Sequence, residues 1–374
     1  MPQSARCYVE ISRSRIASNY RAVCAAAGPG TQVMGVVKAD AYGHGAVEVS
    51  RILTREGARW LAVSSVEEGK TLRAAGIECR ILVMAGVMPW ERGAIREFHL
   101  TPALHSLDEI AFFRDADATT PLDLHLKIDT GLNRLGTQAA AGEIASAVNS
   151  VPGIRLEGLM SHFASAADFT STQTDEQIRR FNEIISNLAA FGIRPPLTHC
   201  ASTNAIAYAR PGASKPLVRP GHAIYGYVSP ARGDAPVSTL HVEPALSWKT
   251  RIVGIKDLPA GARVGYGGSF VTPAPMRIAV LAAGYADGIA HRHPNKGKVI
   301  AAGRLAPMIG PVSMDLTTID ITPSPHLKPG DEVTLLGRDG DVSLDAQQIA
   351  RTAGTISYNV LCGISARVKR CYVD

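Results

Sequence analysis

Short apolar runs alternate with stretches of helical periodicity between about residue 30 and residue 228, and no other feature constrains the fold of this chain as strongly. Helical stretches include 45–58, 65–76 and 172–192, the last with Thr174 as its expected N-cap and Gly192 as its C-terminal stop. Repeated strand–helix units predict parallel strands with helical crossovers. The predicted strands are 33–38, 60–65, 80–86, 99–104, 122–129, 155–162, 196–202 and 216–221.

Two folds share this alternation. Eight parallel strands surrounded by helices form a (β/α)8 TIM barrel. An open doubly wound sheet produces the same order of strands and helices, so periodicity alone leaves both folds open. The number of predicted strands is the number that a closed TIM barrel needs, and we take the barrel as the expected fold.

The pattern changes after about residue 238. Strands now follow one another without helices between them, and only 344–354 has helical spacing. A loop rich in Pro, Gly and Ser at 228–241 marks the change. We therefore predict an α/β chain with a TIM-barrel domain at 1–238 and a β-rich C-terminal domain at 239–374. The predicted strands of the second domain are 245–258, 276–286, 297–311, 316–322 and 331–337.

Composition is that of a compact globular protein. Of the 374 residues, 46% are hydrophobic and only 19% are charged, which excludes a disordered chain. The six cysteines are dispersed and include no C-x-x-C pair, so we expect reduced thiols, no metal site and a cytoplasmic location. No apolar run reaches the length of a membrane span, and the net charge of +6 is spread along the chain. We expect neither a membrane nor a nucleic acid as a partner.

Reactive side chains gather where the predicted strands end. In a TIM barrel, the carboxyl ends of the strands form the active site. An amine at such a position can condense with a carbonyl group, although Lys38 taken alone is better explained as an exposed lysine paired with a carboxylate such as Asp40. The residues at or just after the strand ends are Lys38, Arg134, His162, Ser202, Thr203 and Arg219.

The segments after the last two predicted strands have the features of a phosphate site. Ser202 and Thr203 supply hydroxyl groups, and Gly221 and His222 supply backbone N–H groups at the start of a helical turn. Phosphate is commonly bound by these two loops of a TIM barrel. Capping of a helix by Ser202 or Thr203 is the alternative explanation.

Ordered motifs along the whole chain closely resemble those of alanine racemases, which are pyridoxal-phosphate enzymes with a TIM barrel and a C-terminal β domain. A single motif such as YGHG would carry little weight, but the ordered set is specific. The motifs are VVKADAYGHG (36–45), HLKIDTGLNRLG (125–136), LEGLMSHFA (156–164), THCAS (198–202), VRPGHAIYG (218–226), VGYGGSF (264–270), GYADG (284–288), GPVSMD (310–315) and ISYN (356–359).

The resemblance implies pyridoxal 5′-phosphate as the cofactor, with Lys38 as its covalent attachment point and one of two bases. It implies Tyr266 as the second base, reaching the site from the β domain of the partner subunit in a homodimer with shared active sites. Arg219 matches the arginine on the pyridine nitrogen, and His162 matches the histidine beside the tyrosine base. Further implied roles are phosphate binding by Tyr42 and Tyr358, substrate binding by Arg134 and the partner's Met314, and carbamylation of Lys127.

The implied activity is the interconversion of L-alanine and D-alanine, which would supply D-alanine for peptidoglycan or serve alanine catabolism. Two departures from the family pattern matter. The chain has ASTNA where ANSAA is usual, so either Ser202 or Thr203 can be the phosphate ligand, and it has Asn359 where Glu is typical. Asn359 leaves open a racemase of broader range that acts on serine, lysine or arginine. A non-catalytic barrel protein that carries pyridoxal phosphate is the remaining alternative, although that class lacks a β domain.

Overall fold

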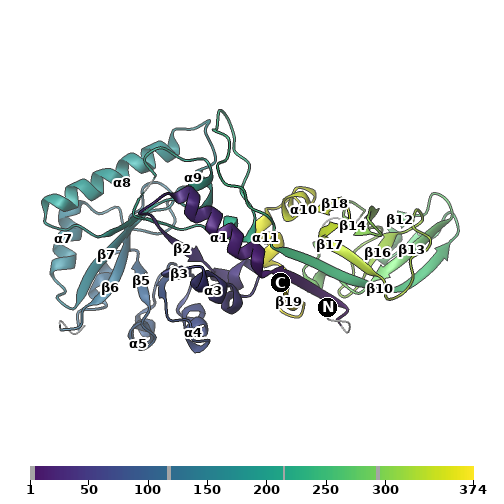
Figure 1. The fold of residues 1–374 in the computed structure, drawn as a ribbon, viewed down its shortest axis with the longest axis horizontal. Helices are drawn as coiled ribbons and strands as arrows, with labels where there is room; N and C mark the ends of the chain where they lie inside the picture. Colours follow the sequence, from purple (N-terminus) through teal and green to yellow (C-terminus); the bar gives the residue numbers. More distant parts are fainter. Residues whose placement is uncertain (1–4, 116–118, 214, 292–294) are drawn as a thin grey trace. The chain divides into compact units, whose positions relative to one another are not determined.

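A computed structural model describes residues 5–115, 119–213, 215–291 and 295–374 of the chain. The chain folds into two compact units (Figure 1). The barrel unit consists of Arg15–Ala41 and Ala46–Glu243, and the sheet unit consists of Met1–Ser14, Tyr42–Gly45 and Pro244–Asp374. The domain boundary between residues 238 and 239 stays a prediction.

In the described part of the barrel unit, eight parallel strands form one sheet in the order β8-β7-β6-β5-β4-β3-β2-β9. The two outer strands approach each other as well, because N of Arg219 donates a hydrogen bond to O of Ala201 at 2.9 Å and Ser202 bridges to Arg219. The sheet is thus a nearly closed barrel, which confirms the predicted TIM fold over the open sheet. The strands are β2 (Gln32–Val36), β3 (Trp60–Val63), β4 (Arg80–Val83), β5 (Thr101–Leu104), β6 (Leu122–Lys127), β7 (Ile154–Met160), β8 (Leu197–His199) and β9 (Leu217–Val218).

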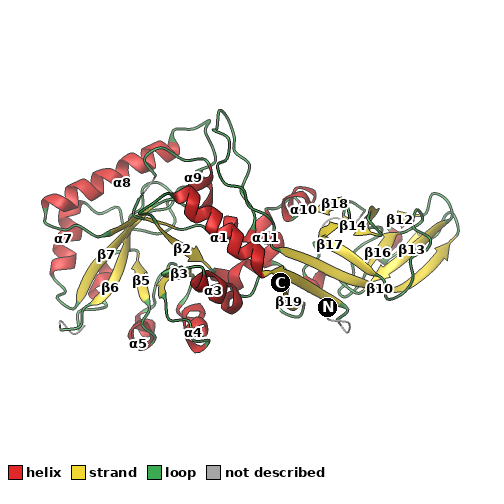
Figure 2. Cartoon of the chain, in the orientation of Figure 1, coloured by secondary structure: helices red, strands yellow, loops and turns green. Residues whose placement is uncertain are grey.

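Helices surround these strands (Figure 2). The longest, α8, spans Gln173–Ala190 and ends as predicted, with Gly192 at φ +78° and N of Ile193 bonded to O of Leu188 at 3.1 Å. The predicted N-cap was wrong: Thr172 occupies the N-cap position without a side-chain capping hydrogen bond, and Thr174 lies buried in the first turn. The helices and short 3-10 turns are α1 (Arg13–Ala27), α2 (Lys38–Tyr42), α3 (Ala46–Arg55), α4 (Val66–Ala74), η1 (Pro89–Glu91), α5 (Arg92–Glu97), α6 (Leu107–Ala111), α7 (Ala141–Asn149), α8, α9 (Thr203–Ala207) and η2 (His222–Tyr225).

Strand β6 shows how the barrel interior comes to hold polar groups. Successive side chains of a strand point to opposite faces, so Leu124 and Leu126 share one face and His125 and Lys127 share the other. All four are at most 4% exposed. One face of β6 therefore supplies apolar packing, while the other carries an imidazole and an amine in a buried environment.

The sheet unit is mostly antiparallel. Its main sheet runs in the order β15-β14-β17-β10-β1-β19, and β1 (Cys7–Ser12) lies between β10 and the parallel strand β19. The predicted strands are confirmed, and 344–354 contains helix α10 (Ala346–Ala353) with Asp345 as N-cap. The expectation of a single helix was wrong, because the described residues also form α11 (Ser357–Cys362). The remaining elements are β10 (Leu246–Leu258), β11 (Arg263–Val264), η3 (Tyr266–Gly268), β12 (Phe270–Val271), β13 (Met276–Leu281), η4 (Tyr285–Asp287), β14 (Lys298–Ala301), β15 (Arg304–Pro307), β16 (Thr317–Asp320), β17 (Glu332–Asp339), β18 (Val342–Leu344) and β19 (Lys369–Val373).

Over the residues that the structure describes, none of the helices combines the length and the apolar character that crossing a membrane would require.

Candidate active site

Lys38 lies at the carboxyl end of β2 and begins an unusual turn. Residues 39–42 of α2 have φ between 51° and 55°, so this short helix is left-handed. A left-handed conformation costs an L-amino acid about 1–2 kcal/mol per residue. The carboxylate of Glu68 supports the turn, because its Oε1 accepts a hydrogen bond from N of Ala39 at 2.6 Å. Strain held in place by a neighbouring carboxylate next to a reactive lysine is typical of a functional site.

Arg219 follows β9 and is 3% exposed. Its Nη1 donates to Nδ1 and O of His199 at 2.6 and 2.8 Å. Its Nη2 donates to O of Ser161 at 2.6 Å and to Nδ1 of His162 at 3.4 Å. A guanidinium has five N–H groups, and among the described residues these contacts use the four on Nη1 and Nη2. The N–H on Nε is the one left to bind a ligand.

His162, just past the end of β7, lies among positive charges. Burial, and then the charge of Arg219, lowers the pKa of His162 to about 3. The imidazole is therefore neutral at neutral pH. Further cations that lower this pKa follow two other strands: Lys127 and Arg134 at the end of β6, and Lys38 at the end of β2. This end of the barrel has an excess of positive charge, which suits an anionic ligand.

Lys127 ends β6 and is 4% exposed. Burial, and then the charges of Arg134 and Arg219, lowers the pKa of Lys127 to about 8. The loop that follows is held by Asp129, whose Oδ1 accepts hydrogen bonds from N of Gly131 and N of Leu132, both at 3.1 Å. Arg134 lies on this loop with an exposed side chain. A partly neutral buried amine thus lies near an exposed guanidinium on a firmly held loop.

The loops after β8 and β9 meet through Thr203. Its Oγ1 accepts hydrogen bonds from N of Gly221 at 3.3 Å and from N of Ala223 at 3.1 Å. Ser202 occupies the N-cap position of α9, but its side chain makes no capping hydrogen bond. Capping of α9 therefore does not explain the Ser202 hydroxyl, whereas Thr203 satisfies backbone N–H groups at the start of η2. His222 is 1% exposed and stacks on Tyr227, with ring centroids 5.1 Å apart, so its backbone is what this loop can offer a ligand.

The two tyrosines predicted to bind phosphate contact each other in the sheet unit. The ring centroids of Tyr42 and Tyr358 are 5.9 Å apart and the rings are tilted by 46°. Burial, and then Tyr358, raises the pKa of Tyr42, so its hydroxyl keeps its proton and can donate it to an anion. Nδ1 of His44 lies 3.0 Å from O of Tyr42 and steadies the turn.

Tyr266 and Met314 are exposed on the sheet unit, at 78% and 55%. Tyr266 lies in η3, at the tip of the β11–β12 hairpin, between Gly265 at φ +73° and Gly267 at φ +68°. A Cβ added at Gly265 would lie 2.7 Å from Cδ of Pro311, so the backbone there packs closely against the proline ring. The backbone of this tyrosine is fixed, while its ring projects into solvent.

Comparison with known proteins establishes the family to which this chain belongs. A model described as "Alanine racemase, N-terminal domain" matches residues 11–230, and a model described as "Alanine racemase, C-terminal domain" matches residues 245–372. The chain belongs to the alanine racemase family. Among relatives, the alanine racemase of Halothermothrix orenii is 38% identical over 98% of this chain and 96% of its own length. The alanine racemase of Syntrophobacter fumaroxidans is 39% identical over 96% of each chain.

Solved structures of the family have the same fold. The alanine racemase of Bacillus anthracis with bound L-Ala-P superposes with a TM-score of 0.91 at 31% identity, covering 100% of this chain and 96% of that chain. The alanine racemase of Clostridium difficile in complex with cycloserine gives 0.89 at 30% identity, covering 99% and 96%. Membership of the alanine racemase family makes this chain an amino-acid isomerase.

The site also contains buried residues to which we assigned no role: His125 and His199, which lie in the family motifs, and Gln177, which lies outside them on α8. His199 and His125 are fully buried and contact each other through ring nitrogens 2.8 Å apart. Gln177 donates from Nε2 to O of His162 at 3.1 Å and accepts at Oε1 from N of Ala164 at 2.9 Å. The two histidines could have been found from the sequence, because each is a polar residue within a predicted apolar strand, at a position that faces the barrel interior.

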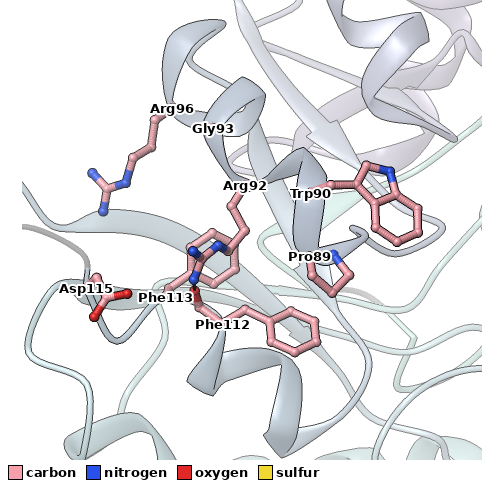
Figure 3. Close-up of a pocket in the computed structure, with 8 residues that line it drawn as sticks. All are labelled: Pro89, Trp90, Arg92, Gly93, Arg96, Phe112, Phe113 and Asp115. Carbon is pink, nitrogen blue, oxygen red and sulfur yellow. Dashed lines mark hydrogen bonds between the residues drawn. The ribbon is translucent and has the colours of Figure 1, made fainter.

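A separate pocket of about 360 Å³ lies on the barrel unit (Figure 3). Residues of η1 and α5 form one side of it, and residues just after the end of α6 form the other. Trp90 at its rim is 80% exposed, and Nη1 of Arg92 donates a hydrogen bond to O of Phe112. None of the predicted site residues lines it. The residues drawn in Figure 3 are Pro89, Trp90, Arg92, Gly93, Arg96, Phe112, Phe113 and Asp115.

Proposed function

We propose that this member of the alanine racemase family interconverts L-alanine and D-alanine in the cytoplasm with pyridoxal 5′-phosphate as cofactor, using Lys38 and Tyr266 as its two bases. The observation that carries the proposal is the cation cluster at one end of the barrel, centred on the buried Arg219. That cluster needs an anion, and the Nε–H of Arg219 needs an acceptor. The carboxylate of an amino acid would supply the anion, and the pyridine nitrogen of the cofactor would supply the acceptor.

The residues present fit this cofactor. Lys38 would hold it covalently and Arg219 would bind its pyridine nitrogen. When bound, pyridoxal phosphate stabilises negative charge at the α-carbon of the amino acid. The groups that would bind its phosphate are the hydroxyls of Tyr42, Tyr358, Ser202 and Thr203 and the backbone at Gly221 and His222. Thr203 is well suited, because its oxygen accepts two backbone N–H groups and its own O–H remains able to donate.

Arg219 would keep the ring nitrogen of the cofactor unprotonated. An arginine is a donor only and keeps its proton, since its pKa, lowered by burial to about 10, is still above neutral pH. A nitrogen that accepts a hydrogen bond from a cation stays unprotonated. A neutral ring withdraws electrons less strongly than a protonated one. We infer that this limits side reactions and favours return of the proton to the α-carbon.

His162 prepares Tyr266 to act as a base. His162 is neutral, and its Nδ1 faces a donor on Arg219. A neutral imidazole that accepts at Nδ1 carries its hydrogen on Nε2. That N–H can donate to the phenol oxygen of Tyr266 and so stabilise the ionised phenol, which is the form able to take a proton. Lys38 and Tyr266 would then exchange the α-proton on opposite faces of the substrate.

Lys127 and Arg134 would position the substrate carboxylate. Arg134 supplies a planar pair of donors on the loop held by Asp129. A second cation at Lys127 would repel Arg134, whereas a carbamate there would attract it. Because its pKa is lowered to about 8, the Lys127 amine is partly neutral near neutral pH, as carbamylation by CO2 requires. We therefore propose that Lys127 is carbamylated and supports Arg134.

The exposed Tyr266 supports a homodimer with two shared active sites. A phenol held on a rigid hairpin and left 78% exposed is an arrangement suited to insertion into another surface. Met314 is exposed on the same unit, and the partner's Met314 would complete the substrate pocket. Two-fold symmetry then gives two identical sites, each with Lys38 of one chain and Tyr266 of the other.

The direct test is a panel of L-amino acids followed by chiral chromatography of the products. We expect L-alanine to give equal amounts of both enantiomers, with serine, lysine and arginine converted far more slowly. Faster conversion of one of those three would show the broader specificity for which Asn359, exposed on α11, leaves room. No loss of optical rotation from L-alanine by the holoenzyme would overturn the proposed activity. If the enzyme does racemise L-alanine, growth tests would decide between supply of D-alanine for peptidoglycan and alanine catabolism.

A further inference from the structure

A line of buried polar side chains crosses the interior of the barrel from Arg219 to Arg80. Nη1 of Arg219 lies 2.6 Å from Nδ1 of His199, and Nε2 of His199 lies 2.8 Å from Nδ1 of His125. Nε2 of His125 lies 3.6 Å from Oε2 of Glu157. Glu157 in turn pairs with Arg80 through both carboxylate oxygens. The line joins the arginine of the candidate active site to a carboxylate on an inner position of β7.

Local structure is specialised to build this line. Leu124 on β6 pairs with Leu156 on β7, but the next residue, His125, pairs with Gly158. Glu157 is therefore an extra residue in β7, as in a β-bulge, and such bulges commonly redirect a side chain near an active site. Gly158 has no side chain, and any Cβ there would come within 2.4 Å of the His125 ring. The bulge and the glycine together make room for the imidazole beside the carboxylate.

Aromatic packing holds the far end of the line. The ring of Trp60 lies 5.4 Å from that of His125, centroid to centroid. The guanidinium of Arg80 lies 4.3 Å from the centre of the Trp60 ring. Arg80 also bonds to Asp123 at 3.1 Å, so both its charge and its position are fixed. Glu157 is thus a paired carboxylate in a defined place.

The hydrogen bonds of the line have one consistent direction. Arg219 can only donate, so Nδ1 of His199 accepts. A neutral imidazole has one donor and one acceptor, so Nε2 of His199 donates to Nδ1 of His125. Nε2 of His125 makes no hydrogen bond among the described residues, but it faces the negative charge of Glu157 at 3.6 Å, and that charge favours a hydrogen on this nitrogen. Both rings are neutral, because burial lowers the pKa of His125, and burial followed by the charge of Arg219 lowers the pKa of His199.

We propose that Glu157 is a positioning residue for the racemase: acting through His125 and His199, it fixes both rings as Nε2–H tautomers and thereby holds Arg219 with its Nε–H toward the cofactor. With the opposite tautomers, Nδ1–H of His199 would face the N–H groups on Nη1 of Arg219, and the guanidinium would turn away. A carboxylate at the far end disfavours that arrangement, because it would place the lone pair on Nε2 of His125 against the negative charge of Glu157, 3.6 Å away. The effect on the cofactor rests on the proposed function, whereas the tautomers are a property of this chain alone.

The tautomers can be measured directly. Long-range proton–nitrogen NMR of the full-length holoenzyme, with 15N-labelled histidine and assignment by His125→Gln and His199→Gln, reports which nitrogen of each ring carries the proton. We expect Nε2–H at both positions at pH 7. A proton on Nδ1 of either ring, or a doubly protonated ring, would overturn the proposal whether or not the enzyme racemises alanine.

Glu157→Gln tests the role of the carboxylate. This substitution keeps the shape but removes the charge and adds a donor. We expect signals from the opposite tautomer of His125, and we expect kcat to fall about tenfold with little change in KM, the size of effect usual for weakening a hydrogen bond to a charged group. The visible absorption of the bound cofactor should become pH-dependent, because a loosened Arg219 no longer keeps the ring nitrogen unprotonated.

Arg179→Gln is the control. Arg179 lies on α8 and forms an exposed ion pair with Glu183 at 2.7 Å, away from the buried line. This variant should leave the tautomers, kcat and absorption unchanged. If Glu157→Gln retains wild-type tautomers, or if its absorption stays independent of pH, Glu157 does not position Arg219. If Glu157→Gln does not fold, the tautomers of the unmodified enzyme still decide the proposal.

Discussion

Nη1 of Arg219 lies 2.6 Å from Nδ1 of His199, and both side chains are buried in the barrel. A guanidinium can only donate, so this contact requires a histidine that is neutral at Nδ1. Burial, and then the charge of Arg219 itself, holds the pKa of His199 well below its ordinary range. The arginine thus maintains the state of the histidine that binds it, and the two form one unit of the active site.

Arg219→Lys should lower kcat for alanine racemisation by about 10- to 100-fold. Lysine keeps the charge but loses the planar array of donors, and one charge-assisted hydrogen bond is worth about 1.5–3 kcal/mol. Chiral chromatography of initial rates gives the measurement. Arg210→Lys is the control, since Arg210 is equally buried but contacts Ala166 and Asp168 instead. Equal activity in the two variants would contradict the role of Arg219.

Gly158→Ala should destabilise the protein by about 1–3 kcal/mol, as overpacking of a core does. The new Cβ would lie 2.4 Å from the His125 ring, which is held on its other sides by Trp60 and His199. Thermal unfolding checks this. Gly254→Ala on β10 is the control, because a Cβ added at Gly254 would have no described heavy atom within 4 Å, and its melting temperature should match that of the wild type. Similar losses in both variants would argue against the close packing.

The enzyme should lose stability as the pH falls below about 6.5, in part through His105. Burial, and then the charge of Lys127, lowers the pKa of His105 to about 4. The unfolded chain takes up a proton near pH 6.5 and the folded chain does not, so stability decreases between these two values. By pH 5 this histidine should account for about 2 kcal/mol. His105→Gln should therefore show a smaller drop in melting temperature from pH 7 to pH 5; an unchanged drop would refute the assignment.

Carbamylation of Lys127 should give a 13C NMR signal after incubation with labelled bicarbonate. The amine adds CO2 and releases one proton, so the signal should weaken as the pH falls below about 8, the pKa of Lys127. Lys127→Ala should remove the signal. Lys256→Ala, at an exposed position of β10, should retain it. Persistence of the signal in Lys127→Ala would assign the carbamate to another residue.

Much of the barrel was predictable because each of its strands is indicated by a short stretch of neighbouring residues in the sequence. Each apolar run between 33 and 221 corresponds to a strand. A parallel strand that is buried on both faces needs a continuous run of apolar residues, and such a run is visible in the sequence without knowledge of the strands beside it. Lys38, His162 and Arg219 were located for the same reason: each stands within two residues of a strand end, and strand ends share one face of the barrel.

The remaining features depend on contacts that no local pattern encodes. The left-handed turn at 39–42 contains no glycine, so nothing in its sequence predicts positive φ; it depends on Glu68, a residue of α4. The N-cap of α8 was displaced by two residues because Thr174 is taken into the helix interior. The contact between His125 and His199 joins residues 74 positions apart and needs an extra residue in β7 to form. Such features follow from tertiary packing.

Subunit complementation tests the central claim, that each active site combines Lys38 of one chain with Tyr266 of the other. Lys38→Ala and Tyr266→Phe homodimers should each be nearly inactive, because each lacks one base at both sites. Exchange of subunits between the two variants gives half heterodimers, in which one site has both defects and the other has none. Activity should then recover to about a quarter of wild type. No recovery, with heterodimers verified by native mass spectrometry, would contradict the shared site.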